Sequence, residues 1–266
     1  MSHVEVTRRG RVLEVKLNKP KVNAIDVAMS QDMGRAFAML RDDPELWVGI
    51  LTAAGEKVFC AGWDLKALNA GEMSLDNWWE TADYGIGGFG GLTENWQLNK
   101  PVICALNGLT IGGGFEIAMS CDLIIAADHV QFGLPEMPLG MVPDAGALQR
   151  LPRLIPRNIA TEMFLLGRRM TADEAARFGL VNKVVPADKL METARAWADQ
   201  IAGSAPLAMQ TVKEVERAIQ AMPLEAAFNH MRTGNLPTYR AMLRSDDAAE
   251  GIAAFVEKRE PNFKGR

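Results

Sequence analysis

The sequence predicts an α/β protein whose strands pair mostly in parallel. Short apolar runs, typical of buried strands, recur along the first half of the chain, and helical stretches alternate with them. This alternation is the pattern of parallel sheets covered by crossover helices. From about Leu148 onward the apolar residues are spaced as in helices, so the second half is expected to be mainly helical.

The elements can be placed in order along the chain. Residues 11–17 alternate between apolar and polar side chains, as a half-buried strand does. Asp26 can cap a helix that runs to about Arg41, with apolar residues at helical spacing. A short apolar helix is expected over 115–120, after the glycines at 112–114. Three apolar runs have the length and composition of buried strands: 47–52, 101–107 and 123–127.

Two parts of the chain depart from this rhythm. Residues 69–99 are rich in Gly, Asn and Trp, and a loop of this length inside a compact domain is usually functional or mobile. Residues 190–202 are amphipathic, and Pro237 should kink or break the second of the helical stretches that follow. Those stretches cover 207–221, 224–243 and 246–258. We therefore expect a core, 1–204, and a helical C-terminal region, 205–266.

Composition argues against several classes of function. Hydrophobic residues make up 48% of the 266 residues, charged residues make up 23%, and the net charge is -4. These values are ordinary for a soluble globular protein and unlike those of a nucleic-acid binder, which presents a basic face. No run approaches the roughly 18 apolar residues of a membrane span, and the N-terminus shows no targeting signal, so a cytoplasmic location is expected.

Metal and cofactor motifs are also missing. The three cysteines form no C-x-x-C pair and the three histidines have no metal-ligand spacing, so no metal site is expected. Residues 85–90 formally match the dinucleotide pattern G-x-G-x-x-G, but no buried strand precedes them and no clear helix follows. A flexible loop is the better interpretation of this segment. A serine elbow and a Gly-Lys-Ser/Thr phosphate loop are absent.

Glycines and carboxylates suggest a different chemistry. Gly112 to Gly114 lie where a strand turns into a helix, and could either bind an anion with exposed N–H groups or only form a tight turn. Glu116 interrupts the apolar helix that follows, where burial would raise its pKa into a range useful for proton transfer. Glu136 follows Pro135 on a loop. Spacing alone gives no reason for the two glutamates to meet, and each could be an ordinary surface residue.

Several motifs in this order resemble the crotonase, or enoyl-CoA hydratase/isomerase, family over essentially the whole chain. They are Ala61-Gly62-x-Asp64-Leu65, Asn107-Gly108-x-x-x-Gly112-Gly113-Gly114-x-Glu116, Phe132-x-x-Pro135-Glu136, Gln149-Arg150-Leu151-Pro152, Ala175-Ala176-x-x-Gly179-Leu180-Val181-Asn182 and Glu257-Lys258-Arg259. The resemblance implies a ClpP/crotonase-like spiral of ββα units. It also implies a C-terminal helical region that joins subunits into a homotrimer or a hexamer.

The resemblance also implies roles for individual residues. Glu116 would orient or activate water, and Glu136 would exchange the α-proton of an acyl-CoA. The backbone N–H groups of Ala61 and Gly113 would hold the thioester oxygen. Coenzyme A would be part of the substrate, with no permanently bound cofactor. Its contacts and those of the acyl group would come from Val22, Ala24, Asp64, Leu65, Gly112, Pro135 and Asp144.

More narrowly, segments such as Ala61-Gly62-Trp63-Asp64-Leu65-Lys66 and Val142-Pro143-Asp144 resemble the carnitinyl-CoA dehydratase subfamily. Its acyl group bears a trimethylammonium, which binds well to aromatic faces and carboxylates. The candidates for such a site are Trp63, Phe89, Glu94 and Trp96, although each aromatic ring could equally be part of the core. The stretch 73–84 and Pro237 depart from the subfamily pattern.

Three alternatives stay open. The first is a generic short-chain enoyl-CoA hydratase. The second is a dienoyl- or enoyl-CoA isomerase, since dienoyl-CoA isomerases carry an acid at the position matching Asp144. The third is a non-catalytic CoA-binding scaffold, which is expected to lack one of the two glutamates that this chain retains.

Overall fold

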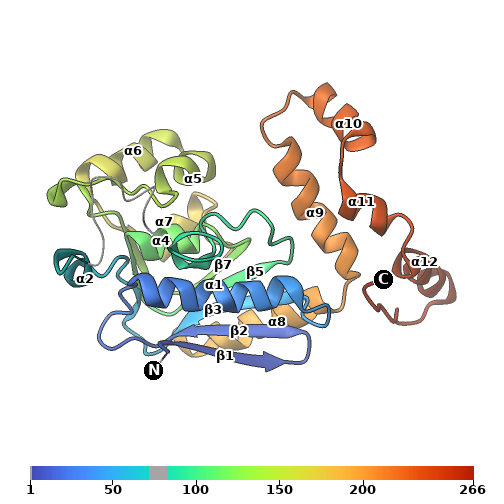
Figure 1. Cartoon of the computed structure of the whole chain (residues 1–266), viewed down its shortest axis with the longest axis horizontal. Coiled ribbons are helices and arrows are strands. Elements are labelled where there is room, and N and C mark those ends of the chain that lie inside the picture. Colours follow the sequence, from blue (N-terminus) through green and yellow to red (C-terminus); the bar gives the residue numbers. More distant parts are fainter. Residues whose placement is uncertain (1, 72–82) are drawn as a thin grey trace.

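The strands of residues 2–71 and 83–266, the part of the chain described by this computed structural model, form two sheets (Figure 1). The larger sheet has the order β1-β2-β3-β5-β7-β10 and the smaller one the order β4-β6-β8-β9. All neighbours pair in parallel except β1 with β2 and β8 with β9. The larger sheet comprises β1 Val4–Arg9, β2 Val12–Leu17, β3 Val48–Ala53, β5 Val102–Leu106, β7 Leu123–Ala127 and β10 Lys183–Val185; the smaller comprises β4 Val58–Cys60, β6 Leu109–Ile111, β8 Gln131–Gly133 and β9 Met170–Thr171.

Successive turns of the chain repeat one arrangement. Each turn adds a strand to the larger sheet, then a strand to the smaller sheet, and then a helix. The turns are β3, β4 and α2 (Leu65–Asn69); β5, β6 and α4 (Gly113–Ala118); and β7, β8 and the 3₁₀-helix η2 (Met137–Leu139). The predicted α/β fold, a spiral of ββα units, is confirmed. As a result the segments that follow β4, β6 and β8 lie next to one another.

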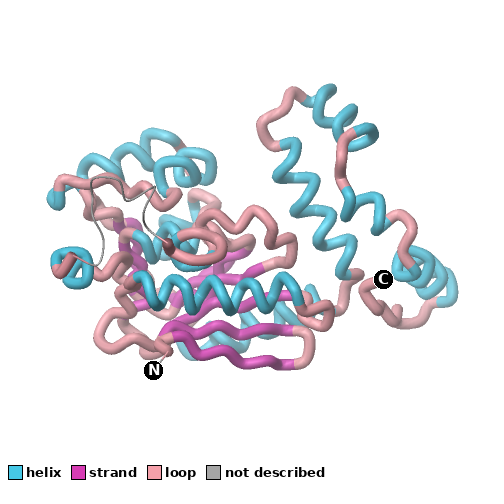
Figure 2. Tube along the Cα trace, viewed as in Figure 1, coloured by secondary structure: helices cyan, strands magenta, loops and turns pink. Residues whose placement is uncertain are grey.

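The strands of the larger sheet are buried on both faces. On β5, Val102, Cys104 and Leu106 belong to the main core, whereas Ile103 and Ala105 pack toward α8 (Leu190–Ala202). Helix α1 (Val27–Asp42) covers the opposite face, so the sheet lies between two helical layers (Figures 1 and 2). The remaining elements of the core are α5 Ala147–Leu154, α6 Arg157–Leu166, α7 Ala172–Arg177 and the 3₁₀-helices η1 Phe89–Gly91 and η3 Ala187–Lys189.

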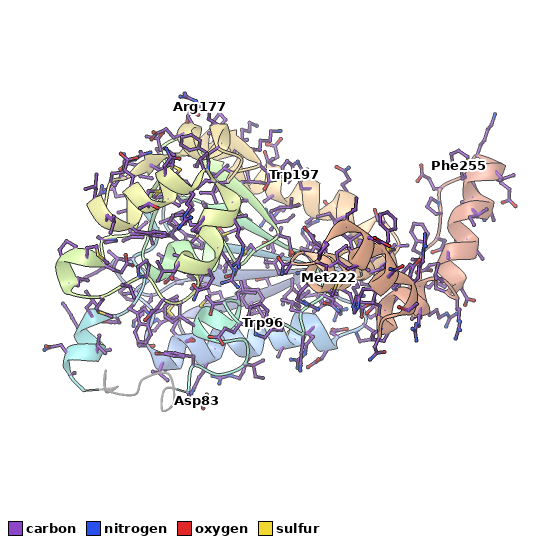
Figure 3. All side chains as sticks on the ribbon, turned by 90° about the horizontal axis from the view of Figure 1, so that it is seen from above. Asp83, Trp96, Arg177, Trp197, Met222 and Phe255 are labelled. Carbon is purple, nitrogen blue, oxygen red and sulfur yellow. The ribbon has the colours of Figure 1, made fainter. Side chains whose placement is uncertain are left out.

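The C-terminal region is entirely helical and extends away from the sheets (Figure 2). It comprises α9 Pro206–Ile219, α10 Leu224–Thr233, α11 Pro237–Met242 and α12 Asp246–Glu257. Pro237 is the first residue of α11, so the predicted break of the second stretch is confirmed. Large apolar side chains are exposed on these helices, and Phe255, near the far end in Figure 3, is 85% exposed.

The glycine-rich segment near residue 90 is closely packed, which differs from the flexible loop expected there. A Cβ on Gly91 would lie 2.6 Å from the backbone nitrogen of Gly34 in α1, and one on Gly90 would lie 2.3 Å from Ile117 in α4. Glycine is therefore required at both positions, which have φ values of +70° and +63°.

Of the stretch 73–84, residues 73–82 lie outside the described part of the chain. Within that part, no helix is long and apolar enough to span a membrane.

Candidate active site

A cavity opens where the segments after β4, β6 and β8 meet. It encloses about 700 Å³, including the part that is open to solvent, a size typical of small-molecule sites. Much of its wall is apolar and includes Leu65, Leu68, Ile111, Leu139, Met141 and Val142. Three carboxyl groups face it, those of Glu116, Glu136 and Asp144. Tertiary folding thus brings together the two glutamates that sequence spacing could not connect.

Glu116 lies in the first turn of α4 and is only 2% exposed. Its Oε1 accepts the backbone N–H of Ala147 at 2.9 Å. The pKa of Glu116 is raised to about 8, chiefly by burial and also by the charges of Glu136 and Asp144, against the lowering effects of the Ala147 hydrogen bond and the Arg150 charge. The group can therefore gain or lose a proton near neutral pH.

Glu136 is half-buried between Pro135 and η2. Its Oε2 is buried and accepts no hydrogen bond from any described residue. Its Oε1 lies against Gly112, where an added Cβ would be 2.8 Å away. Burial raises the pKa of Glu136 to about 7, and the charge of Asp144 acts in the same direction. A buried carboxylate oxygen without a partner is costly, and such groups are typical of reactive sites.

The start of α4 presents backbone donors at the cavity. The Gly112 carbonyl accepts the N–H groups of Phe115 and Glu116, while the N–H of Gly113 has no acceptor within residues 2–71 and 83–266. Gly112 has φ +53° and thus needs to be glycine, as the tight-turn interpretation requires. Because Gly113 also lines the cavity, its N–H can serve a negatively charged oxygen there. The turn and the anion site are compatible.

Comparison with known proteins identifies the family to which the chain belongs. A family model described as enoyl-CoA hydratase/isomerase matches residues 7–266. The chain belongs to the enoyl-CoA hydratase/isomerase family. Solved structures of enoyl-CoA hydratases from Mycobacterium tuberculosis and Bacillus anthracis superpose with TM-scores of 0.89 and 0.88, at 35% and 34% identity, and each comparison covers 100% of both chains.

Curated relatives are more similar in sequence. A carnitinyl-CoA dehydratase from Proteus mirabilis is 52% identical over 263 residues, which covers 99% of this chain and 98% of the relative. A carnitinyl-CoA dehydratase from Salmonella typhimurium is 51% identical over the same length and coverage. The chain therefore matches these relatives from end to end.

The prediction for Ala61 as an oxyanion donor in this family member is wrong. Ala61 lines the cavity, but its N–H donates to the carbonyl oxygen of Val22 at 3.0 Å and is therefore already used within the protein. The segment 61–64 pairs with the segment 22–25 as a short strand would, since Ile25 donates to Gly62 and Asp64 donates to Ile25. The pairing with segment 22–25, which the motif itself does not display, therefore decides where the Ala61 N–H points.

The residues expected to contact coenzyme A fall into two groups. Leu65 and Pro135 line the cavity, together with Gly112 and Asp144. Asp64 instead caps α2 and pairs with Lys19 at 2.9 Å, so its carboxylate is occupied within the protein. The Val22 carbonyl is likewise taken by Ala61, whereas the backbone of Ala24 makes no hydrogen bond to any described residue.

The predicted acyl-pocket residues also separate. Trp63 lines the cavity, and Phe89 stacks on it with ring centroids 5.0 Å apart. Glu94 and Trp96 line a second cavity, between the core and α9, and Asp144 lines both cavities. There the Arg150 guanidinium lies 6.0 Å from the Trp96 ring. Trp63 therefore lines the cavity that holds the glutamates, with Phe89 packed against it, whereas Glu94 and Trp96 line the other cavity.

Sequence reasoning assigned no role to Ala147, Arg150 or Tyr84. Arg150 is part of a family motif, but its charge acting on Glu116 depends on the fold. Tyr84 contacts Trp63 edge to face, with ring centroids 5.1 Å apart. Only the position of Tyr84 in the glycine-rich loop hinted at such a contact. Among the described residues, no group of His, Cys, Asp and Glu side chains is arranged to hold a metal ion.

Proposed function

We propose that this protein adds water reversibly across the Cα=Cβ bond of an acyl-CoA, interconverting crotonobetainyl-CoA plus water with L-carnitinyl-CoA. The observation that carries the reaction type is the pair Glu116 and Glu136, two carboxyl groups with raised pKa values facing one cavity. The carnitinyl group is supported by relatives named carnitinyl-CoA dehydratase that are about 52% identical over nearly the whole chain.

In the hydration direction, water adds to Cβ while Glu116 accepts one of its protons. The electron pair of the double bond moves toward the thioester, so that negative charge develops on its oxygen. We assign the N–H of Gly113 to that oxygen, and a donor in this role typically contributes about 3–4 kcal/mol to the transition state. Glu136 then delivers a proton to Cα, and general acid–base help of this kind gives about 10²–10⁴-fold in rate.

The two raised pKa values, about 8 for Glu116 and about 7 for Glu136, place a shared proton mainly on Glu116. That is the state from which dehydration starts, with Glu136 taking the α-proton and Glu116 protonating the leaving hydroxyl, and hydration runs the same steps in reverse. Both groups share a region of low polarity, and ionising one makes it harder to ionise the other. Near neutral pH the pair therefore holds about one proton, which supplies one acid and one base. Coenzyme A enters only as part of the substrate, with Leu65 and Pro135 at the wall it would meet.

The direct test is to offer the purified protein crotonobetainyl-CoA and crotonyl-CoA and to follow loss of the enoyl thioester. Hydration of either supports the hydratase reaction, and preference for the first supports the carnitinyl group. Binding of coenzyme A with no turnover of either thioester would instead favour a non-catalytic scaffold.

An isomerase is a second candidate, because Asp144 faces the same cavity as the two glutamates. Such an enzyme moves a proton between carbon atoms without adding water. Incubating the protein with a 3,5-dienoyl-CoA and with a 3-enoyl-CoA separates the two reactions. Rearrangement of either without hydration of 2-enoyl-CoA would favour the isomerase.

We also propose that residues 205–266 join subunits into a homotrimer, or into a hexamer of two trimers. Apolar side chains stand exposed on α10 and α12, among them Leu224 at 76%, Phe255 at 85% and Val256 at 73%. Unpaired apolar surface of this kind is typical of an interface. Analytical ultracentrifugation should give three or six times the 29.1 kDa of one chain, and a purely monomeric species would refute the proposal.

A further inference from the structure

The charges around the cavity do not balance. Glu116, Glu136 and Asp144 all face it, and the charge of Asp144 acts on both glutamates. The charge of Arg150 lowers the pKa of Glu116 and so partly offsets the negative charges. Asp144 has no such partner, because within residues 2–71 and 83–266 no Lys, Arg or His side chain lies within ion-pair distance of it. A half-buried carboxylate in this position lacks a counter-ion that a ligand could supply.

An aromatic cluster borders the same cavity as this carboxylate. The Trp63 ring lines the cavity and is packed against Phe89 on one side and Tyr84 on another, with centroid distances of 5.0 and 5.1 Å. Asp144 is close enough to Tyr84 for its charge to raise the pKa of the phenol, which burial already raises. A carboxylate next to aromatic faces is the environment that binds a quaternary ammonium, because that cation has no N–H to donate.

We propose that Asp144, with Trp63 and Tyr84, forms the subsite for the trimethylammonium group of the substrate and sets the preference for a cationic acyl chain. This inference rests on the proposed function. The cationic nitrogen is two bonds from Cβ, the carbon that receives water. It must therefore lie beside Glu116 and Glu136, which is where Asp144 faces the cavity.

Glu94 and Trp96 are poor alternatives for this role. They line the second cavity, and both lie close to the guanidinium of Arg150, whose charge interacts with Glu94. Arg150 also donates a hydrogen bond to the Thr93 carbonyl, which keeps its charge in that place. A second cation there would be repelled, so the substrate cation is better matched by Asp144.

The test compares two substrates of equal shape. Crotonobetainyl-CoA carries the trimethylammonium, and (E)-5,5-dimethylhex-2-enoyl-CoA replaces the nitrogen by carbon. Asp144→Asn should lower kcat/KM for the cationic substrate, relative to kcat/KM for the neutral substrate, by about 10- to 100-fold, the effect of losing a paired charge. Asp188→Asn, which removes the same charge from an exposed site, should leave the ratio of the two substrates unchanged.

Three results would overturn the subsite. Asp144→Asn could lower both substrates equally, which would give Asp144 a role in the reaction itself, or it could change neither. Glu94→Gln could shift the ratio instead, which would move the cation to the second cavity. If Asp144→Asn fails to fold, the unsubstituted protein decides: it should bind 4-trimethylammoniobutanoyl-CoA more tightly than 5,5-dimethylhexanoyl-CoA, and equal affinity would overturn the proposal.

Failure of the subsite and failure of the proposed function give different results. A protein that hydrates crotonyl-CoA and the neutral isostere but not crotonobetainyl-CoA remains a hydratase without a cation subsite. A protein that hydrates crotonobetainyl-CoA equally well with and without the Asp144 carboxylate keeps the proposed function and loses only the inference.

Discussion

The carboxylate of Glu116 and the backbone N–H of Ala147 are joined by a buried hydrogen bond of 2.9 Å. The bond links α4 to the first residue of α5 and fixes the carboxyl group at the cavity. Its acceptor is one oxygen, which an amide also has. The charge and the proton-accepting ability of Glu116 can therefore be removed while this bond is kept.

Glu116→Gln should lower kcat for hydration by about 10²–10⁴-fold while the fold survives, because an amide accepts the Ala147 N–H but cannot take a proton from water. Glu136→Gln should show a loss of similar size. Steady-state hydration kinetics and circular dichroism check both variants, with Glu192→Gln on the exposed face of α8 as the control. Near-normal turnover in either variant would refute the role given to that residue.

The pH dependence of kcat/KM should be bell-shaped, with its maximum near neutral pH. Burial raises the pKa of Glu136 to about 7 and that of Glu116 to about 8. At lower pH both groups are protonated and the base is lost, and at higher pH both are ionised and the acid is lost. A kcat/KM that stays flat from pH 5 to 9, measured at enoyl thioester concentrations well below KM, would contradict this pairing.

Glu116→Gln should also stabilise the protein at alkaline pH. The pKa of Glu116 is raised from 4.5 to about 8 in the folded state, so between these values the unfolded chain releases a proton that the folded chain retains. The free energy of unfolding of the unsubstituted protein therefore falls as pH rises through this window. The variant lacks this loss and should be more stable by about 1–3 kcal/mol at pH 8, with a difference that shrinks toward pH 5.

Urea unfolding at the two pH values measures this difference. The quantity to compare is the free energy of unfolding of the variant minus that of the unsubstituted protein. If this difference is smaller at pH 8 than at pH 5, Glu116 is not held in a neutral form by burial.

Gly112→Ala should impair the reaction by displacing Glu136. The added Cβ would lie 2.8 Å from Oε1 of Glu136, and the residue has φ +53°. Gly10→Ala is the matched control, because Gly10 has φ +58° and a Cβ there meets nothing within 4 Å. Both variants should lose about 1 kcal/mol of stability or more from backbone strain, but only Gly112→Ala should lose hydration activity. Equal activity in the two would mean that the Gly112–Glu136 contact is unimportant.

Much of the fold could be predicted from local patterns. Asp26 accepts the Met29 N–H at 2.8 Å as an N-cap, and Pro237 ends one helix and begins the next, because caps and prolines act over a few residues. The two-faced burial of β5 follows from its continuous apolar run. These features depend on chemistry within one element, which the sequence displays directly.

The site could be predicted only in part, because it depends on contacts between distant segments. Glu116 and Glu136 face one cavity because β6 and β8 are neighbours in the smaller sheet, and family resemblance supplied that information where spacing did not. The direction of the Ala61 N–H depends on its pairing with Val22 in a distant segment and was predicted wrongly. Trp96 has the right side chain for a cation, but Arg150 lies beside it.

The most direct measurement compares kcat/KM for dehydration of L-carnitinyl-CoA and 3-hydroxybutyryl-CoA on one preparation. The proposed function, with Glu116 and Glu136 removing water beside a subsite that favours a cation, predicts turnover of both and a clear preference for L-carnitinyl-CoA. A preference for 3-hydroxybutyryl-CoA would contradict the carnitinyl assignment, and turnover of neither would contradict the hydratase chemistry itself.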